Sequence, residues 1–362
     1  MKVGLVGMPG AGKSTLFRLL TGAAPPGGDR RKAPLGSARV PDSRVDRLAE
    51  MYRPQKVTYA SIAVTEIPGF VPSSLAGHGV KGLDPKGFVD SLRDVDALVY
   101  VVRAFDDPAV PQLREAPAPA DDLSDLAAEL ILADWQLVET RLERLKETRK
   151  KRPTHEAEVA VLSKAAGLLE AGTPLYAAGF TPEELALLTG YTFFTQKPAI
   201  VAVNLDEEQL RSGAFPQKDE LLDRAGRLSA PVVEFAAQVE AEIAELDPQD
   251  RALFMEDLGL SEPGVARLAQ AAYARLGLIS YFTVGEDEVR AWTVRRGANA
   301  QEAAGAIHSD IARGFIRAEV ASYGELIEAG GWAALQKMGR VRLEGRDYIV
   351  EDGDIMSFRF NV

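Results

Sequence analysis

The sequence predicts an α/β fold with an inserted α-helical hairpin and a small α+β domain at its C-terminal end. Strand and helix signals alternate over residues 1–122, an apolar stripe at helical spacing follows over 123–190, and short strands surround one helix over 279–362. The alternation of strands and helices returns over 191–278. We therefore expect one α/β domain built from the two alternating segments, with the hairpin inserted between them and the last segment forming a separate domain.

The first seventeen residues combine a short apolar strand, a glycine-rich turn and the start of a helix. The turn reads G-x-x-x-x-G-K-S, a pattern whose backbone N–H groups point at one anion beside the positive end of the helix dipole. In this pattern Lys13 reaches the β- and γ-phosphates of a nucleotide, and the Ser14 hydroxyl suits Mg²⁺. The expected phosphate-binding residues are Gly7, Pro9, Gly10, Ala11, Gly12, Lys13, Ser14 and Thr15.

Composition excludes several classes of protein. The 362 residues include no cysteine, which rules out disulfides, thiolate metal sites and cysteine nucleophiles. The net charge of −11 argues against a uniformly basic nucleic-acid binder. No apolar run approaches the roughly 18 residues of a membrane span, and the first strand leads directly into the glycine-rich turn. We therefore expect a cytoplasmic protein without a signal peptide or a membrane contact.

The remaining signals place the strands of the α/β domain and its loops. Buried strands are expected at 3–6, 62–67, 97–102, 198–204 and 231–235. Two stretches rich in glycine, with proline and arginine in the first and serine in the second, cover residues 23–41 and 71–87 and predict mobile loops. In a fold with this phosphate-binding turn, these loops fall where the two nucleotide-sensing switch loops belong.

The inserted hairpin is expected to be coiled-coil-like, with two long antiparallel helices separated near Pro153. Its tip is basic and includes Arg149, Lys150, Lys151 and Arg152. Two interpretations stay open for these residues: a solvated, salt-bridged helix end, and a binding patch on a protruding arm of an acidic protein.

The C-terminal domain is expected to contain a strand over 289–294 and a helix that starts with a capping box at Asn299 and Glu302 and runs through Ala312. A hairpin is predicted from the two short apolar runs at 341–343 and 348–350. A final strand is expected from Ile355 to the end.

The base of the nucleotide should be read after the strand that ends at Asn204. Guanine readers carry Asn-Lys-x-Asp at this point, whereas this chain has Leu205 in place of lysine and Glu207 in place of aspartate. A carboxylate that is one methylene longer is displaced from the guanine edge, so the preference for guanine should fall. A polar strand-to-helix turn without a role in binding is the alternative interpretation.

Taken together, these motifs resemble the Obg-like ATPases, the YchF subfamily of translation-factor-related P-loop GTPases, over nearly the whole chain. The segments that carry the resemblance are Gly7 to Thr15, Asn204 to Glu207, Val239 to Leu246, Glu288 to Thr293, His308 to Asp310, Gly314 to Ala318, and Gly345 to Val350 with the residues that follow it. The resemblance implies a P-loop G domain, the helical hairpin, and a C-terminal TGS domain of the ubiquitin-like β-grasp type.

The resemblance also implies a function. It implies a protein that binds ATP in preference to GTP, hydrolyses it slowly with Mg²⁺, and associates with ribosomes or rRNA through the hairpin and the TGS domain. We expect this protein to be a monomer. The base site that it implies consists of Asn204, Leu205, Glu207, Ala236 and Ala237.

The chain departs from the family pattern in both switch loops. No threonine occurs between Thr21 and Thr58, where family members place one on the γ-phosphate and Mg²⁺, and Ser37 is a weak substitute. The second switch begins with Glu66 in place of an aspartate that acts on Mg²⁺ through water. Phe70 occupies the position of the catalytic glutamine of Ras-like proteins.

Two residues remain as candidates for catalysis, Glu66 and His78, although we expect His78 to be a solvent-exposed loop residue. Because phosphoryl transfer depends on positioning and charge neutralisation, these departures should slow hydrolysis while leaving binding intact. The leading hypothesis is a slow ATPase switch. The alternatives are a non-hydrolysing nucleotide-binding scaffold, a GTP-binding protein and, less well supported, a metabolic kinase.

Overall fold

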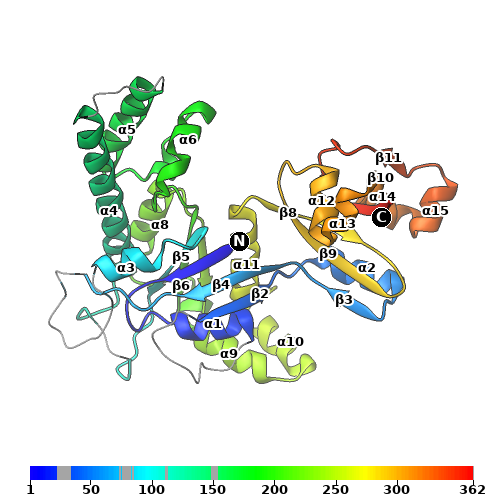
Figure 1. Cartoon of the computed structure of the whole chain (residues 1–362). Coiled ribbons are helices and arrows are strands. Elements are labelled where there is room, and N and C mark those ends of the chain that lie inside the picture. Colours follow the sequence, from blue (N-terminus) through cyan, green and yellow to red (C-terminus); the bar gives the residue numbers. More distant parts are fainter. Residues whose placement is uncertain are drawn as a thin grey trace. The chain divides into compact units, whose positions relative to one another are not determined.

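The computed structural model describes residues 1–22, 34–72, 75, 83, 85–110, 113–147 and 154–361 (Figure 1). The chain packs as two compact units. The first unit comprises Met1–Gly36 and Ala63–Ala272, and the second comprises Ser37–Ile62 and Tyr273–Val362.

The first unit is built on a six-stranded sheet in the order β2-β4-β1-β5-β6-β7. Its strands are β1 (Lys2–Val6), β2 (Leu35–Arg39), β4 (Ser61–Glu66), β5 (Ala97–Arg103), β6 (Ala199–Asn204) and β7 (Val232–Phe235). The neighbours from β4 to β7 are all parallel, so their carboxyl ends meet at one edge of the sheet, where ligands of α/β proteins bind. The α/β fold and the five expected strands are confirmed, whereas β2 was not predicted.

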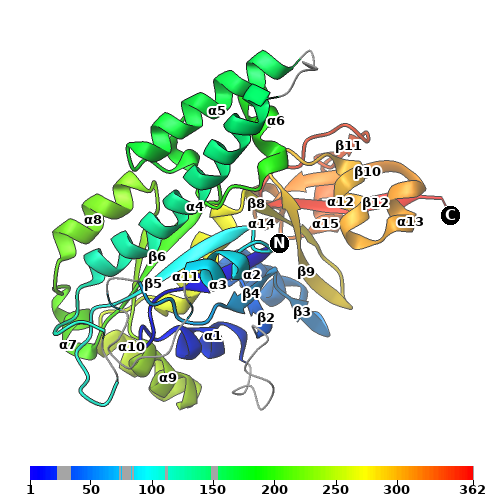
Figure 2. The same cartoon turned by 60° about the vertical axis from the view of Figure 1, so that its left-hand side comes forward.

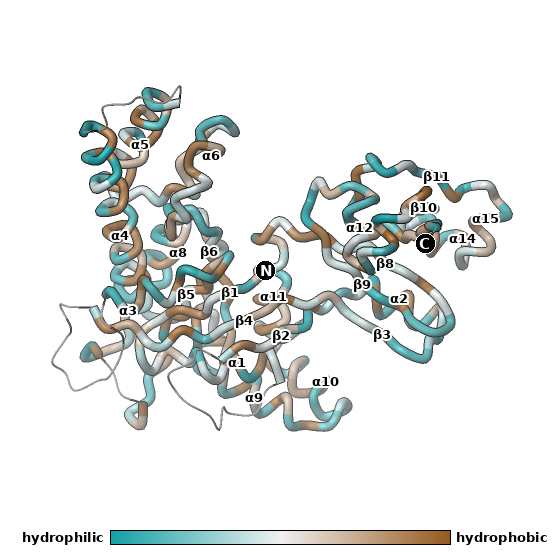
Figure 3. Tube along the Cα trace, in the orientation of Figure 1, coloured by the Kyte–Doolittle hydropathy of each residue, from teal (hydrophilic) through white to brown (hydrophobic). Residues whose placement is uncertain are grey.

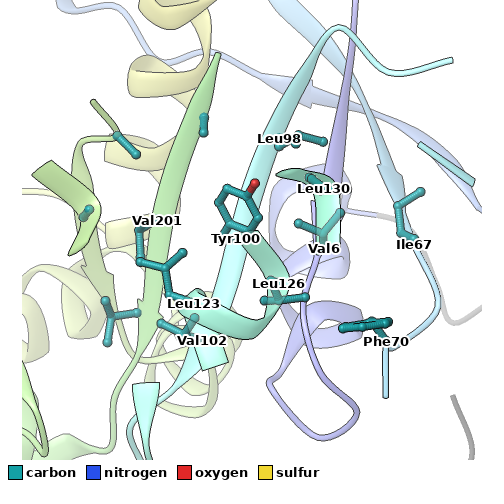
Figure 4. Packing of buried hydrophobic residues seen from close by; sticks show 14 of the residues in the cluster. Val6, Ile67, Phe70, Leu98, Tyr100, Val102, Leu123, Leu126, Leu130 and Val201 are labelled. Carbon is teal, nitrogen blue, oxygen red and sulfur yellow. The ribbon is translucent and has the colours of Figure 1, made fainter. Parts of the chain in front are cut away.

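Helices cover both faces of this sheet, with α4 and α8 on one face and α1 and α9 on the other (Figure 2). The helices of this unit outside the hairpin are α1 (Lys13–Thr21), α3 (Pro85–Ser91), α7 (Glu207–Ser212), α8 (Lys218–Arg227), α9 (Ala237–Glu245), α10 (Pro248–Asp257) and α11 (Gly264–Arg275). Side chains of the central strands, such as Tyr100 and Val201, pack against Leu123 and Leu126 of α4 (Figure 4). Burial on both faces explains why these strands read as continuous apolar runs.

The inserted segment forms the expected antiparallel hairpin. Hydrophobic and hydrophilic residues alternate along both of its long helices (Figure 3). Its elements are α4 (Pro119–Glu147), α5 (His155–Glu170), η2 (Leu175–Ala177), α6 (Pro182–Leu188) and η3 (Thr189–Tyr191). The fully buried carboxylate of Asp134 accepts hydrogen bonds from the N–H groups of Phe194 and Thr195, which ties α4 to the segment that returns to the sheet. The basic residues Arg149, Lys150, Lys151 and Arg152 lie outside the described residues.

The second unit contains a mixed sheet in the order β11-β10-β12-β8-β9-β3. Its elements are α2 (Ser43–Tyr52), β3 (Lys56–Thr58), β8 (Leu278–Thr283), β9 (Glu288–Arg295), α12 (Ala300–Ile307), α13 (Ser309–Arg313), β10 (Phe315–Ser322), α14 (Tyr323–Ala329), α15 (Trp332–Lys337), β11 (Arg342–Glu344) and β12 (Asp354–Phe360). Strands β8 and β12 pair in parallel, and their other neighbours, β9 and β10, are antiparallel to them. Helix α12 packs against β9 and β10. This is the expected β-grasp arrangement.

Two local predictions for this unit were wrong. The expected hairpin over 341–350 does not form, because β11 pairs with β10 instead and Ile349 makes only an isolated bridge with Asn299. The helix that starts at the confirmed Asn299–Glu302 capping box ends at Ile307. There His308 turns extended, and its Nδ1 accepts a hydrogen bond from the Asp310 N–H to start a new helix.

A segment that the sequence placed in the first domain packs in the second unit. Strand β3 adds to the edge of the mixed sheet beside β9, with Lys56 paired to Glu288 and Thr58 to Arg290 (Figure 1). Helix α2 packs on β9. Its Arg44 donates to Asp42 and to Asp352, which anchors the helix to the turn before β12.

This packing predicts that α2 stabilises the C-terminal sheet. The change Leu48→Ala removes a fully buried side chain and should lower the free energy of unfolding of the second unit by about 2–4 kcal/mol. Hydrogen exchange of β8 and β9 should accelerate. Leu253→Ala, at a side chain that is 60% exposed on α10, is the matched control. Unchanged exchange in β8 and β9 would contradict the assignment of α2 to this unit.

Candidate functional site

A cavity of about 530 Å³ opens at the carboxyl ends of the parallel strands in the first unit. Its lining comes from four segments that are far apart in the sequence: the glycine-rich turn, the loop after β5, the turn after β6 and the start of α9. The lining residues are Gly10, Gly12, Lys13, Ser14, Thr15, Phe105, Asp106, Asp107, Val110, Asn204, Leu205, Asp206, Ala237 and Gln238. The predicted phosphate site and the predicted base site therefore share one cavity.

The turn before α1 has the conformation that its glycines were expected to permit. Gly12 lies at φ 93°, and a side chain there would collide with the Asn204 amide at 2.2 Å. Lys13 folds back into the turn, where its ammonium group donates to the carbonyl oxygens of Gly7 and Met8 at 3.1 and 2.8 Å. Burial lowers the pKa of Lys13 to about 8, against the opposing effect of the Glu66 carboxylate. An anion bound in this turn would contact the buried Lys13 ammonium group.

Ser14, which lines the cavity, is paired with Glu66, which lies outside the lining. The Ser14 hydroxyl donates to the Glu66 carboxylate at 2.5 Å, although the two residues are 52 positions apart in the sequence. A hydroxyl and a carboxylate beside a phosphate-binding turn are hard oxygen ligands of the kind that Mg²⁺ takes, with substrate phosphates and waters completing its shell. Among the residues that the structure describes, no three His, Asp or Glu side chains gather to hold a metal by themselves.

Asn204 holds the cavity together rather than projecting into it. Its side chain is only 3% exposed, donates to the Ala11 carbonyl at 3.2 Å and accepts from the Ala237 N–H at 3.0 Å. The two contacts join the glycine-rich turn to the start of α9. Pro9, Ala11 and Ala236 do not line the cavity, and Pro9 and Ala11 line a smaller cavity instead.

The turn after β6 places its two carboxylates differently from what the sequence suggested. Asp206 lines the cavity and caps α7, with its Oδ1 accepting from the Gln209 N–H. Glu207 is the first residue of that helix, and its carboxylate binds Arg211 one turn later at 3.1 Å, outside the cavity lining.

The sequence motifs did not predict one wall of the cavity. Phe105, Asp106, Asp107 and Val110 lie in an irregular loop directly after β5, and Gln238 follows β7. The signal that could have found the loop is its position, because the carboxyl ends of neighbouring parallel strands meet at the binding edge.

Phe70 occupies the expected position of a catalytic glutamine but belongs to the core. Its ring is 1% exposed and stacks on Phe88 at 4.7 Å (Figure 4). The Phe70 N–H donates to the Gly7 carbonyl, so the backbone runs beside the turn while the side chain points away from solvent. Ser37 is exposed on β2 and does not line the cavity. His78 lies outside the described residues.

Comparisons with known proteins agree with this arrangement. The family model YchF-GTPase_C, described as "Protein of unknown function (DUF933)", matches residues 278–361. The chain is 38% identical to the ribosome-binding ATPase YchF of Bacillus subtilis and 39% identical to that of Haemophilus influenzae, covering all of this chain and 100% and 99% of theirs. The solved Schizosaccharomyces pombe YchF GTPase is 28% identical with a TM-score of 0.85, over 99% of this chain and 97% of that one.

No helix among the described residues is long and apolar enough to cross a membrane.

The buried state of Lys13 predicts a pH-dependent affinity for a nucleoside triphosphate. In the free protein Lys13 loses its proton above about pH 8, whereas bound phosphate oxygens raise its pKa, so binding at higher pH must take up a proton. The affinity should fall by up to about tenfold per pH unit above this value. Calorimetry near pH 9 in buffers of different ionisation heat measures the uptake.

The control for this prediction is Lys13→Arg, whose guanidinium stays charged at these pH values. Any affinity that this variant retains should no longer fall with pH. Heats that are independent of the buffer in the wild-type protein near pH 9 would contradict the prediction.

Proposed function

The chain belongs to the YchF family, and on this premise we propose that it is a slow ATPase whose nucleotide state controls docking on ribosomes. The single observation that carries the proposal is the phosphate end of the cavity, where buried Lys13 and the Ser14–Glu66 pair lie together. The names of the relatives, ribosome-binding ATPases, supply the reaction and the partner.

In this proposal the turn and Lys13 hold the phosphates, and Ser14 and Glu66 would hold Mg²⁺. The metal supplies charge neutralisation at the phosphate oxygens when it is bound. Lys13 exchanges its two carbonyl partners for phosphate oxygens, and the main-chain N–H groups of Gly10 to Ser14 add donors from the helix start.

ATP is preferred over GTP because the carboxylate that reads guanine in related proteins is not available here. Glu207 stands at that position in the motif, and its ion pair with Arg211 holds it outside the cavity lining. Guanine would lose the acceptor for its N1 and N2 donors.

Hydrolysis is slow in this proposal because nothing at position 70 can orient the attacking water. Positioning is most of what a protein contributes to phosphoryl transfer, and Phe70 is committed to the core. The same observation favours a second candidate function, a scaffold that holds nucleotide without hydrolysing it.

Docking on the ribosome is assigned to the helical hairpin and the C-terminal domain. The basic tip residues Arg149, Lys150, Lys151 and Arg152 suit a phosphate backbone on an otherwise acidic protein.

The base assignment predicts that Mg²⁺-dependent ATP binding is tighter than GTP binding, and that Glu207→Asp narrows the difference by roughly three- to tenfold. Aspartate is shorter, reaches Arg211 less well and matches the carboxylate of guanine readers. Calorimetry with both nucleotides, with and without Mg²⁺, measures the ratio. Glu208→Asp, at the exposed neighbouring position on α7, is the control. An ATP/GTP ratio that Glu207→Asp leaves unchanged would contradict the role of position 207 in excluding guanine.

The switch predicts that Lys13→Ala lowers single-turnover phosphate release on the order of a hundredfold, because a charge contact to the reacting phosphates is lost. The same variant should abolish the effect of ATP on ribosome co-sedimentation. Lys86→Ala, at an exposed lysine of α3, is the matched control. If wild-type protein releases no phosphate, the scaffold replaces the ATPase. If Lys13→Ala co-sediments with ribosomes as the wild type does, both with and without ATP, nucleotide binding does not control ribosome docking.

A further inference from the structure

The loop after β5 forms the wall of the cavity that faces the turn after β6, yet it has no regular secondary structure of its own. Because such a loop lacks the regular backbone hydrogen bonds of a helix or a sheet, its carbonyl groups must accept hydrogen bonds from side chains or water. In this loop, three of those carbonyls point at a single side chain.

That side chain is Arg103, the last residue of β5. Its Nε donates to the Phe105 carbonyl at 3.0 Å, one terminal nitrogen donates to the Asp107 carbonyl at 3.1 Å, and the other to the Val110 carbonyl at 3.2 Å. The guanidinium carbon also lies 4.4 Å from the centre of the Phe105 ring. A guanidinium is a planar fork that donates from three separate nitrogens at fixed angles, whereas an ammonium group donates from a single nitrogen and cannot match the positions of these three carbonyls.

Arg103 itself does not reach the nucleotide cavity. It is 6% exposed and lines a much smaller cavity behind the glycine-rich turn, together with Pro9 and Ala11. Its effect on a ligand must therefore pass through the loop that it holds.

Gln209 of α7 holds the first residue of the same loop, Ala104. Its amide nitrogen donates to the Ala104 carbonyl at 2.9 Å, while its amide oxygen accepts from the Asp206 N–H at 3.1 Å. Since Asp206 lines the opposite wall, this one side chain joins the two walls without lining the cavity itself. The Ala104 N–H also donates to the Asn204 carbonyl at 3.0 Å.

We propose that Arg103 and Gln209 are positioning residues for the base and ribose end of the nucleotide site, fixing the wall formed by Phe105, Asp106, Asp107 and Val110. This inference rests on the proposed nucleotide binding and adds to it. The phosphates are held by the glycine-rich turn, and the rest of the nucleotide is held by a wall that these two side chains keep in place.

The test compares two ligands that share the phosphate site but differ at the other end. Arg103→Lys keeps the charge and loses the fork, so the dissociation constant of MgATP should rise about tenfold. That of magnesium tripolyphosphate, which lacks base and ribose, should change less than about twofold. In turnover, KM for ATP should rise while kcat stays near its wild-type value.

Two further variants complete the design. Gln209→Glu keeps the shape of the side chain but places an acceptor against the Ala104 carbonyl, and it should weaken MgATP in the same selective way even if Arg103→Lys fails to fold. Arg114→Lys is the matched control, because Arg114 lines the same small cavity but pairs with Asp122 and Asp125 instead of the loop carbonyls. It should leave both ligands unaffected.

The outcomes separate this inference from the proposed function. If the wild type binds neither ligand, the proposed function fails. If the wild type binds both and each positioning variant weakens MgATP and tripolyphosphate equally, or weakens neither, Arg103 and Gln209 do not position the base end and the inference is overturned.

Discussion

The nucleotide cavity depends on one buried amide, that of Asn204. Asn204 is the last residue of β6, and its side chain contacts both the turn before α1 and the start of α9. Its donor and acceptor are both satisfied by main chain, so removing the amide would leave a buried carbonyl and a buried N–H without partners. The contact between Asn204 and the turn also requires glycine at position 12, because the Asn204 amide occupies the space where a β-carbon would lie.

Features that depend on near neighbours in the sequence could be predicted well. The residues Gly7 to Thr15 and the apolar runs of β1, β5 and β6 carry their structure locally, and the strands and the helix α1 form where the sequence predicts them. The position of Glu207 could not be predicted in the same way. Asp206 caps α7, and this begins the helix at Glu207 and directs its carboxylate to Arg211 one turn later.

Long-range pairing explains the other differences. The Thr58 hydroxyl donates to Glu288, which lies 230 positions away in the sequence. The hydrophobic periodicity of residues 37–62 carries no information about such a distant partner. The wall after β5 escaped notice for a related reason. Its structure is imposed by Arg103 and Gln209 through main-chain carbonyls, and carbonyl groups leave no trace in the residue types of the loop.

The segment that begins at Glu66 shows how binding and catalysis can separate in one chain. The Ile67 and Phe70 N–H groups donate to the carbonyls of Leu5 and Gly7, and a β-carbon at Gly69 would lie 2.7 Å from the Pro9 nitrogen. Main-chain contacts of this kind hold Glu66 at Ser14 whatever side chain stands at position 70. With that side chain free to vary, Phe70 joins the core against Phe88 while the Ser14–Glu66 hydrogen bond is kept. In the proposed function, this arrangement would preserve the residues that hold Mg²⁺ and remove the group that would orient water.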